Sequence, residues 1–168
     1  MKKLTIFFGL MMMSLSFAFG QTAEKKKVYD ENADAKVLIA EAVKKAETNK
    51  KHVLLQIGGN WCAWCMLFND LTTNNEEINK YMNDNYEVVH VNYSPKNKNE
   101  AVLAELKHPE RFGFPVFVIL DDKGNLIHTQ NSAYLESKVI KGHDPKEVMS
   151  FLQSWSYKAL DPASYIKK

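Results

Sequence analysis

Cys62 and Cys65 constrain this chain more than any other feature, because they are its only cysteines and stand three residues apart. They follow a short apolar run, residues 52–57, that is closed by two glycines. The length of this run and its flanking glycines predict a buried strand. After Cys62 the residues favour a helix, since neither Gly nor Pro occurs before Pro95. The cysteine pair is therefore expected where a buried strand passes into a helix.

Three physical facts favour redox chemistry at this pair. Cysteines at positions i and i+3 of a first helical turn can close a disulfide without large backbone movement. The free N–H groups and the positive dipole end of the helix stabilise a thiolate at the first cysteine. No other cysteine exists in the chain, so the pair can bond only to itself or to a partner molecule. An inert structural disulfide and half of a zinc site are the alternatives.

A zinc site takes four ligands, and the chain has no second cysteine pair to complete one. The histidines show no paired ligand spacing; they are His52, His90, His108, His128 and His143. We therefore expect no metal at the cysteine pair and no bound cofactor.

Caps and apolar spacing predict the remaining elements. Three helices are marked by the N-cap residues Asp34, Asn75 and Asp144. These helices span residues 33–49, 76–84 and 145–158, and a shorter helix spans 100–107. Further strands are expected at residues 86–93, 114–120 and 126–129, whereas residues 130–141 are ambiguous. The order β-α-β-α-β-β-α predicts an α/β fold, with a central mixed β-sheet flanked by helices on both faces.

Residues 59–65, Gly-Asn-Trp-Cys-Ala-Trp-Cys, resemble the Trp-Cys-x-x-Cys motif of the thioredoxin superfamily, which also follows a buried strand. Further along the chain, Gly113-Phe114-Pro115 resembles the cis-proline of that family and the strand that it opens. An Asp-to-Gly turn at residues 121–124 then matches the family's strand and turn. The resemblance covers residues 33–160 and implies a thioredoxin fold. More narrowly, the chain is similar to the secreted thioredoxin-like thiol–disulfide oxidoreductases of bacteria.

The resemblance implies roles for the residues of the motif. Cys62 is the nucleophile that attacks a substrate disulfide or is attacked by a substrate thiol, and Cys65 resolves the mixed disulfide. Trp61 is expected to pack beside the site and cover part of the disulfide. Trp64 is expected to contact substrate at the surface. For both tryptophans, plain core packing is the alternative.

The resemblance also implies that Pro115 is cis. The backbone of Phe114 then lies beside the cysteines as a docking edge for an extended substrate segment. An ordinary trans proline that opens a strand is the alternative, because proline donates no ladder hydrogen bond and fits at the start of a strand.

The chain departs from the family at positions that affect proton transfer. Trp64 stands where many oxidising members carry a histidine whose charge favours the thiolate. Gln56 stands six residues before Cys62, where many thioredoxins bury a carboxylate, and His90 aligns with a lysine of several members. We hypothesise that Gln56 and His90 point to the same interior side beneath the cysteines and that His90 relays the proton. A satisfied core histidine is the alternative.

Residues 1–20 have the three-part pattern of a secretory signal peptide: two lysines, an apolar run and small residues at the cleavage point. The apolar run is shorter than the roughly 20 residues of a membrane span, and an uncleaved anchor is the alternative. We therefore expect export to the periplasm or the extracellular space. The mature chain divides into a flexible arm at 21–32, a thioredoxin-like domain at 33–160 and a tail at 161–168.

Cleavage of the leader would leave 20 basic and 20 acidic residues, a formal charge of zero. There is no basic stripe and no interleaving of aromatic and basic residues, so nucleic acid is not an expected partner. Zero net charge also gives no attraction to an anionic membrane surface. We expect the mature protein to be soluble and monomeric.

These inferences predict an exported thiol–disulfide oxidoreductase that exchanges disulfides with protein substrates. We favour a reductase over an oxidase, and an exported reductase needs an electron source such as a membrane dithiol donor. Two other functions remain open. One is a thioredoxin-fold binding or chaperone module with an inert disulfide. The other is a metallochaperone that holds a soft metal through the two thiolates.

Overall fold

The structure is a computed structural model that describes residues 27–166 of the 168-residue chain. The predicted signal peptide and residues 21–26 of the predicted arm lie outside the described residues. A four-stranded mixed sheet forms the centre, in the order β2-β1-β3-β4. The strands are β1 (His52–Gly58), β2 (Tyr86–Asn92), β3 (Val116–Leu120) and β4 (Leu126–Asn131).

β1 is the strand that positions the site, and it runs parallel to β2 and antiparallel to β3. β3 and β4 form an antiparallel hairpin. Every residue of β1 is buried, because this strand has a neighbour on each side and helices above and below it. The predicted strands and the predicted mixed sheet are thus confirmed.

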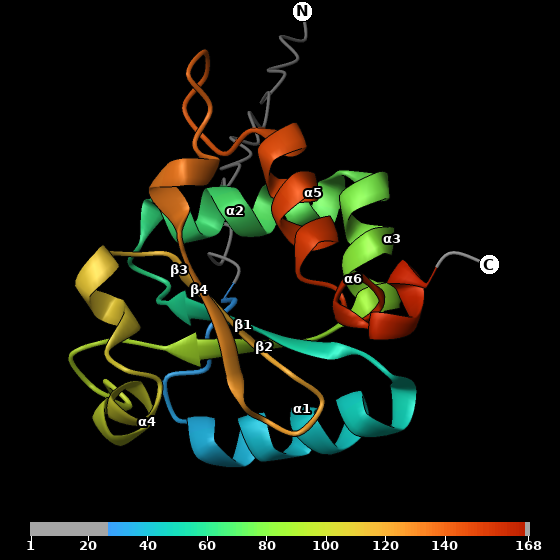
Figure 1. Ribbon diagram of the computed structural model, residues 1–168. Coiled ribbons are helices and arrows are strands. Elements are labelled where there is room, and N and C mark those ends of the chain that lie inside the picture. Colours follow the sequence, from blue (N-terminus) through green and yellow to red (C-terminus); the bar gives the residue numbers. More distant parts are fainter. Residues whose placement is uncertain (1–26, 167–168) are drawn as a thin grey trace, which may run out of the picture.

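Helices cover both faces of the sheet, as Figure 1 shows. α1 (Ala35–Asn49) lies beneath the sheet, while α2 (Ala63–Asn74), α3 (Glu76–Asn85) and α5 (Pro145–Ser154) lie above it. α4 (Glu100–Glu105) follows β2 and packs in the hydrophobic core on the α1 side of the sheet, called the lower core below. Within residues 27–166, no helix combines the length and the apolar character that a bilayer crossing requires.

The side chains of β1 alternate between two hydrophobic cores. Val53, Leu55 and Ile57 lie in the lower core with α1 and α4. Leu54 lies in the upper core, with Phe117 of β3 and residues of α2, α3 and α5. This alternation is the two-residue period of a strand. The next even-numbered residues of β1, Gln56 and Gly58, therefore belong to the same face of the sheet as Leu54, the face that α2 covers.

The three predicted N-caps are confirmed. Asp34 accepts hydrogen bonds from two backbone N–H groups of α1, Asn75 accepts one from Ile78 of α3, and Asp144 accepts one from Lys146 of α5. The prediction for the last helix was wrong at its end, because α5 stops at Ser154 rather than Lys158. Ser156 instead caps a separate short helix, α6 (Tyr157–Leu160), by accepting from Ala159 N–H. A serine side chain that binds backbone in this way favours a helix start over a helix interior.

The ambiguous segment 130–141 contains the end of β4, a 3₁₀ turn η2 (Ser132–Leu135) and a projecting loop. A single β-bridge between Glu136 and His143 closes this loop at its base. The loop is the narrow orange projection in Figure 1, and its residues Val139 and Ile140 are 91% and 65% exposed. The other short elements are η1 (Pro109–Phe112) and η3 (Pro162–Tyr165), the latter within the predicted tail.

The prediction of a flexible arm was wrong for its last residues. Tyr29 is only 2% exposed and packs with the two cysteines. Hydrogen bonds to the side chain of Asn60 hold this segment against the domain, so it is part of the folded unit.

Candidate active site

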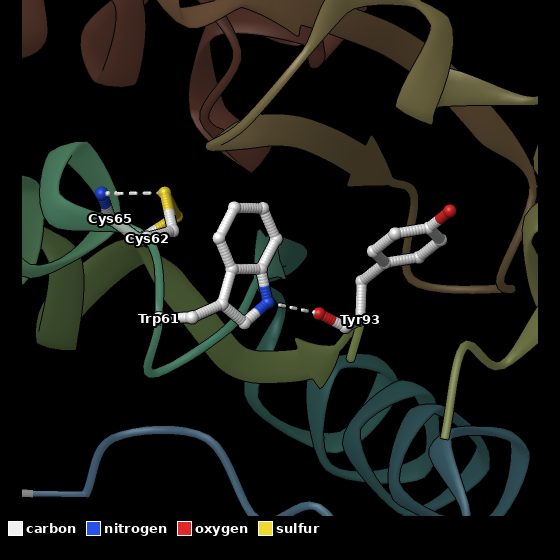
Figure 2. The surroundings of a disulfide bond; sticks show 4 residues. All are labelled: Trp61, Cys62, Cys65 and Tyr93. Carbon is white, nitrogen blue, oxygen red and sulfur yellow. Dashed lines mark hydrogen bonds between the residues drawn. A yellow bond between two sulfur atoms is a disulfide. The ribbon is translucent and has the colours of Figure 1, made fainter. Parts of the chain in front are cut away.

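Cys62 and Cys65 form a disulfide at the start of α2, with their Cα atoms 5.2 Å apart. Cys62 is the N-cap residue of this 12-residue helix, and its Sγ accepts a 3.1 Å hydrogen bond from Cys65 N–H (Figure 2). Both residues are buried, but Cys62 is 6% exposed and Cys65 only 1%. Cys62 is therefore the more accessible of the two residues, although its neighbours cover most of it.

Two glycines leave the space in which the disulfide and Trp61 lie. A Cβ atom on Gly58 would come within 2.5 Å of Cys65 Sγ. A Cβ atom on Gly59 would lie 2.7 Å from Cδ1 of Trp61 and 2.8 Å from the carbonyl oxygen of Tyr93. Any larger residue would push the helix start or the indole away from the end of β1.

The Trp61 ring lies beside the disulfide and reaches toward Tyr93, as Figure 2 shows. Its Nε1–H donates a 2.7 Å hydrogen bond to the carbonyl of Tyr93, just beyond β2. Its edge meets the ring of Phe114, with 5.7 Å between centroids, and Phe114 packs on Tyr93 at 4.7 Å. The side chain of Trp61 is nevertheless 57% exposed, so one part of it faces solvent next to Cys62.

The Phe114–Pro115 peptide bond is cis, which confirms the prediction for Pro115. Pro115 directly precedes β3, and the side chain of Phe114 packs against the cluster formed by Tyr29 and the two cysteines. The structure thus brings the predicted docking edge next to the motif at residues 61–65.

Trp64 is half-buried, and a residue that the sequence did not single out packs against it. The ring of His143 meets Trp64 edge-on at 5.5 Å and Phe68 at 5.1 Å, centroid to centroid. His143 is 3% exposed, and neither of its ring nitrogens has a hydrogen-bond partner among the described residues. Burial lowers the pKa of His143 to about 4, so the ring is neutral at pH 7.

Gln56 and His90 are register partners in the parallel strands β1 and β2, so their side chains share one face of the sheet. Gln56 is 2% exposed. The Nε2 atom of His90 is buried and has no hydrogen-bond partner among the described residues, and burial lowers the pKa of His90. The ring of His90 meets Tyr29 edge-on, at 5.4 Å between centroids.

Tyr29 and Asn60 are site residues that the sequence prediction missed. Asn60 Oδ1 accepts from the N–H groups of Val28 and Tyr29, at 2.9 and 3.1 Å, and Asn60 Nδ2 donates to the carbonyl of Tyr29 at 2.7 Å. The adjacent pair Val28-Tyr29 in a polar, lysine-rich stretch was the one available signal for a buried contact.

Among residues 27–166, no group of three or more His, Cys, Asp or Glu side chains is arranged to hold a metal ion.

Comparison with solved structures shows the fold. The chain superposes on the crystal structure of a disulphide isomerase from Xylella fastidiosa Temecula1 with a TM-score of 0.67 and 22% sequence identity. The superposition covers 77% of this chain and 96% of that one. At this level of identity the similarity establishes a thioredoxin fold.

Comparison with curated sequences finds a thiol:disulfide interchange protein, DsbD, in two strains of Campylobacter jejuni. Each is 33% identical to this chain over 76 residues, which is 45% of this chain and 13% of the relative. The chain thus matches only a small part of those proteins.

A family profile described as Thioredoxin-like matches residues 34–122, more than half of the chain. That segment contains the disulfide, the cis-proline and three of the four strands, and the chain belongs to the thioredoxin-like family.

Proposed function

We propose that this protein is a thiol–disulfide oxidoreductase that acts on protein substrates through Cys62 and Cys65. The observation that carries the proposal is a disulfide at the N-terminus of α2 with the cis-proline segment packed beside it. Membership of the thioredoxin-like family and the match to relatives named thiol:disulfide interchange proteins support it.

The proposed reaction begins at Cys62. In the reducing direction the Cys62 thiolate attacks one sulfur of a substrate disulfide, and the other substrate sulfur leaves with the electron pair. The Cys65 thiolate then attacks Cys62 Sγ, which releases the second substrate thiolate and forms the Cys62–Cys65 disulfide. The positive end of α2 supports this role, because Cys62 caps the helix and its sulfur already accepts a backbone N–H.

We assign substrate contact to Trp61, Trp64, Phe114 and Pro115. Trp61 offers an exposed ring face whose position is set by its hydrogen bond to Tyr93. The backbone ahead of Pro115 is the docking edge for an extended substrate segment, and Phe114 links that edge to Trp61. Trp64 contributes a half-buried ring that packs edge-on against the ring of His143.

We assign the proton relay to His90, with Gln56 as its buried neighbour. The unpartnered Nε2 atom and the lowered pKa leave a neutral imidazole that can accept a proton at neutral pH. Tyr29 packs against the ring of His90 and also with the two cysteines, so one residue contacts both groups.

We further propose that the protein works outside the cytoplasm as a reductase. The leader pattern at residues 1–20 supports export to the periplasm or the extracellular space. A reductase there must be re-reduced after each turnover, so the implied redox partner is a membrane dithiol donor.

The deciding measurement is the equilibrium constant of the Cys62–Cys65 disulfide with glutathione in the mature protein. A potential near that of thioredoxin, about −270 mV, supports the reductase, whereas about −120 to −180 mV indicates an oxidant or an isomerase. A disulfide that never equilibrates contradicts the enzyme and favours a binding or chaperone module. Metal retained by the reduced protein but lost in Cys62→Ser would instead favour a metallochaperone.

A further inference from the structure

Among residues 27–166, Tyr29 is a large aromatic residue that packs with the disulfide from outside the segment shared with the thioredoxin-like family. Its ring is 2% exposed and forms a single buried cluster with Cys62 and Cys65. The buried Tyr29 residue therefore carries a phenolic hydroxyl, which is a hydrogen-bond donor, into the neighbourhood of the two cysteines.

The position is set from within the active-site loop. Asn60, two residues before Cys62, uses both ends of its amide to hold the backbone of Val28 and Tyr29 in three hydrogen bonds. The same residue that leads into the motif thus fixes where the phenol enters the fold. One side chain thus connects the cysteine loop to the backbone of Tyr29.

The hydroxyl of Tyr29 and the sulfur of Cys65 border the same gap above Gly58. A Cβ atom on Gly58 would lie 3.1 Å from Tyr29 Oη and 2.5 Å from Cys65 Sγ, so both atoms border the gap that Gly58 leaves. Burial raises the pKa of Tyr29 far above its usual value. The phenol therefore keeps its proton and can act as a hydrogen-bond donor, not as a base.

We propose that Tyr29 is a positioning residue for Cys65, and that its O–H donates a hydrogen bond to the Cys65 sulfur once the disulfide opens. The inference rests on the proposed exchange reaction. When a thiolate attacks Cys62 Sγ, the Sγ–Sγ bond breaks and its electron pair goes to Cys65 Sγ. Tyr29 retains its proton and shares it with that thiolate, which accepts a stronger hydrogen bond than a disulfide sulfur does.

The test is the equilibrium of full-length mature protein with glutathione for wild type and Tyr29→Phe. Phenylalanine keeps the ring and removes the donor, so the reduced form loses stabilisation and the equilibrium moves threefold to tenfold toward the disulfide. A tenfold change corresponds to a potential about 30 mV more negative. Alkylation of Cys62 in the reduced protein should stay within twofold of wild type, because the variant acts on Cys65.

Tyr86→Phe is the matched control, since Tyr86 is another buried tyrosine and its hydroxyl donates to the Leu152 carbonyl outside the site. This control should lower the free energy of unfolding and leave the equilibrium with glutathione unchanged. Equal shifts in both variants, or no shift in folded Tyr29→Phe, would overturn the proposal. If wild type itself never equilibrates with glutathione, the exchange function fails and not the Tyr29 assignment alone.

A second variant tests the hydrogen bonds by which Asn60 holds the backbone of Val28 and Tyr29. Asn60→Ala releases the backbone of Tyr29 and should move the equilibrium in the same direction as Tyr29→Phe. The double variant should show little further shift, because both changes remove the same hydrogen bond. Fully additive shifts would show that Asn60 acts on the cysteines by another route and would contradict the coupling.

Discussion

The imidazole of His143 meets the indole of Trp64 edge-on, 5.5 Å between ring centroids, and so joins the base of the projecting loop to the residue before Cys65. The imidazole has no hydrogen-bond partner on either nitrogen among the described residues. A charge on this ring would be buried without compensation. The fold around Trp64 is therefore sensitive to acid.

We predict that the protein loses stability between about pH 6.5 and pH 4 through His143. The unfolded chain binds a proton at the ordinary histidine pKa, near 6.5, whereas burial lowers the pKa of His143 in the fold to about 4. The unfolded state thus binds more protons in this window, and stability falls as the pH falls. The expected contribution is about 1–3 kcal/mol, seen in urea unfolding measured across the window.

His143→Phe should reduce this pH dependence, because phenylalanine fills the place between Trp64 and Phe68 and carries no proton, while His90, whose pKa burial also lowers, keeps its contribution. Val148→Ala is the control, since Val148 is a buried residue with no titratable group, so this change should lower stability at every pH and leave the slope as in wild type. Parallel curves for wild type and His143→Phe would contradict the assignment.

A second prediction concerns the relay at His90. His90→Gln should slow the attack of Cys65 on the mixed disulfide by about 10²-fold near pH 7, the lower end of the usual gain from general base catalysis. The effect should shrink at low pH, where the imidazole is protonated and no longer accepts a proton. Stopped-flow fluorescence of mixed-disulfide decay gives the rate.

The charged groups next to His90 provide the control for that experiment. Asp30, Glu41, Lys45 and Glu87 line the same surface pocket as His90. Glu87→Gln changes the charge in this pocket and leaves the imidazole in place, so it should keep the rate of resolution of wild type near pH 7, where the imidazole is neutral. An unchanged rate of resolution in His90→Gln at every pH would reject the relay.

A third prediction separates substrate binding from redox chemistry. Trp61→Phe keeps an aromatic ring but loses the hydrogen bond to Tyr93, so the ring loses its fixed orientation beside Cys62. KM for a protein disulfide such as insulin should rise about threefold to tenfold, the effect of about one hydrogen bond. The glutathione equilibrium should not change. Trp155→Phe, which alters an indole stacked on His128, is the control.

A fourth prediction concerns the junction of α2 and α3. Asn75 ends α2 and caps α3 by accepting from Ile78 N–H, so Asn75→Ala should cost about 1 kcal/mol of folding free energy. Asn74→Ala, at the last residue of α2, removes an exposed amide and should change stability by less than about 0.5 kcal/mol. Thermal or urea unfolding compares the two. A loss in Asn74→Ala as large as in Asn75→Ala would contradict the cap assignment.

Local signals were enough to predict the helices, the strands and the mixed sheet, and they singled out the cysteine pair as the candidate site. The caps Asp34, Asn75 and Asp144 act within a few residues, and the apolar runs of β1 and β3 identify themselves by length and flanking residues. The spacing of Cys62 and Cys65 is likewise a local signal, because two cysteines within one helical turn can form a disulfide. The cis form of Pro115 followed from the family resemblance alone.

The residues that were missed act through contacts distant in sequence. Tyr29 packs with Cys65 while Asn60 holds its backbone, and the pair Val28-Tyr29 in a lysine-rich stretch does not indicate that distant contact. His143 follows the projecting loop, whose sequence has no periodic pattern that would place its end beside Trp64. The end of α5 was misplaced because Trp155 continued the apolar spacing, while the capping role of Ser156 was the stronger local preference.

The position of Tyr29 has a practical consequence for fragment design. The segment shared with the thioredoxin-like family, residues 34–122, leaves out both Tyr29 and His143. A recombinant fragment cut at those family boundaries would lose β4 and α5 as well as the aromatic groups that enclose the cysteine loop on two sides. The expressed protein should therefore begin upstream of Val28. An affinity tag joined directly to Tyr29 or Asp30 would replace or crowd the backbone N–H groups that donate to Asn60.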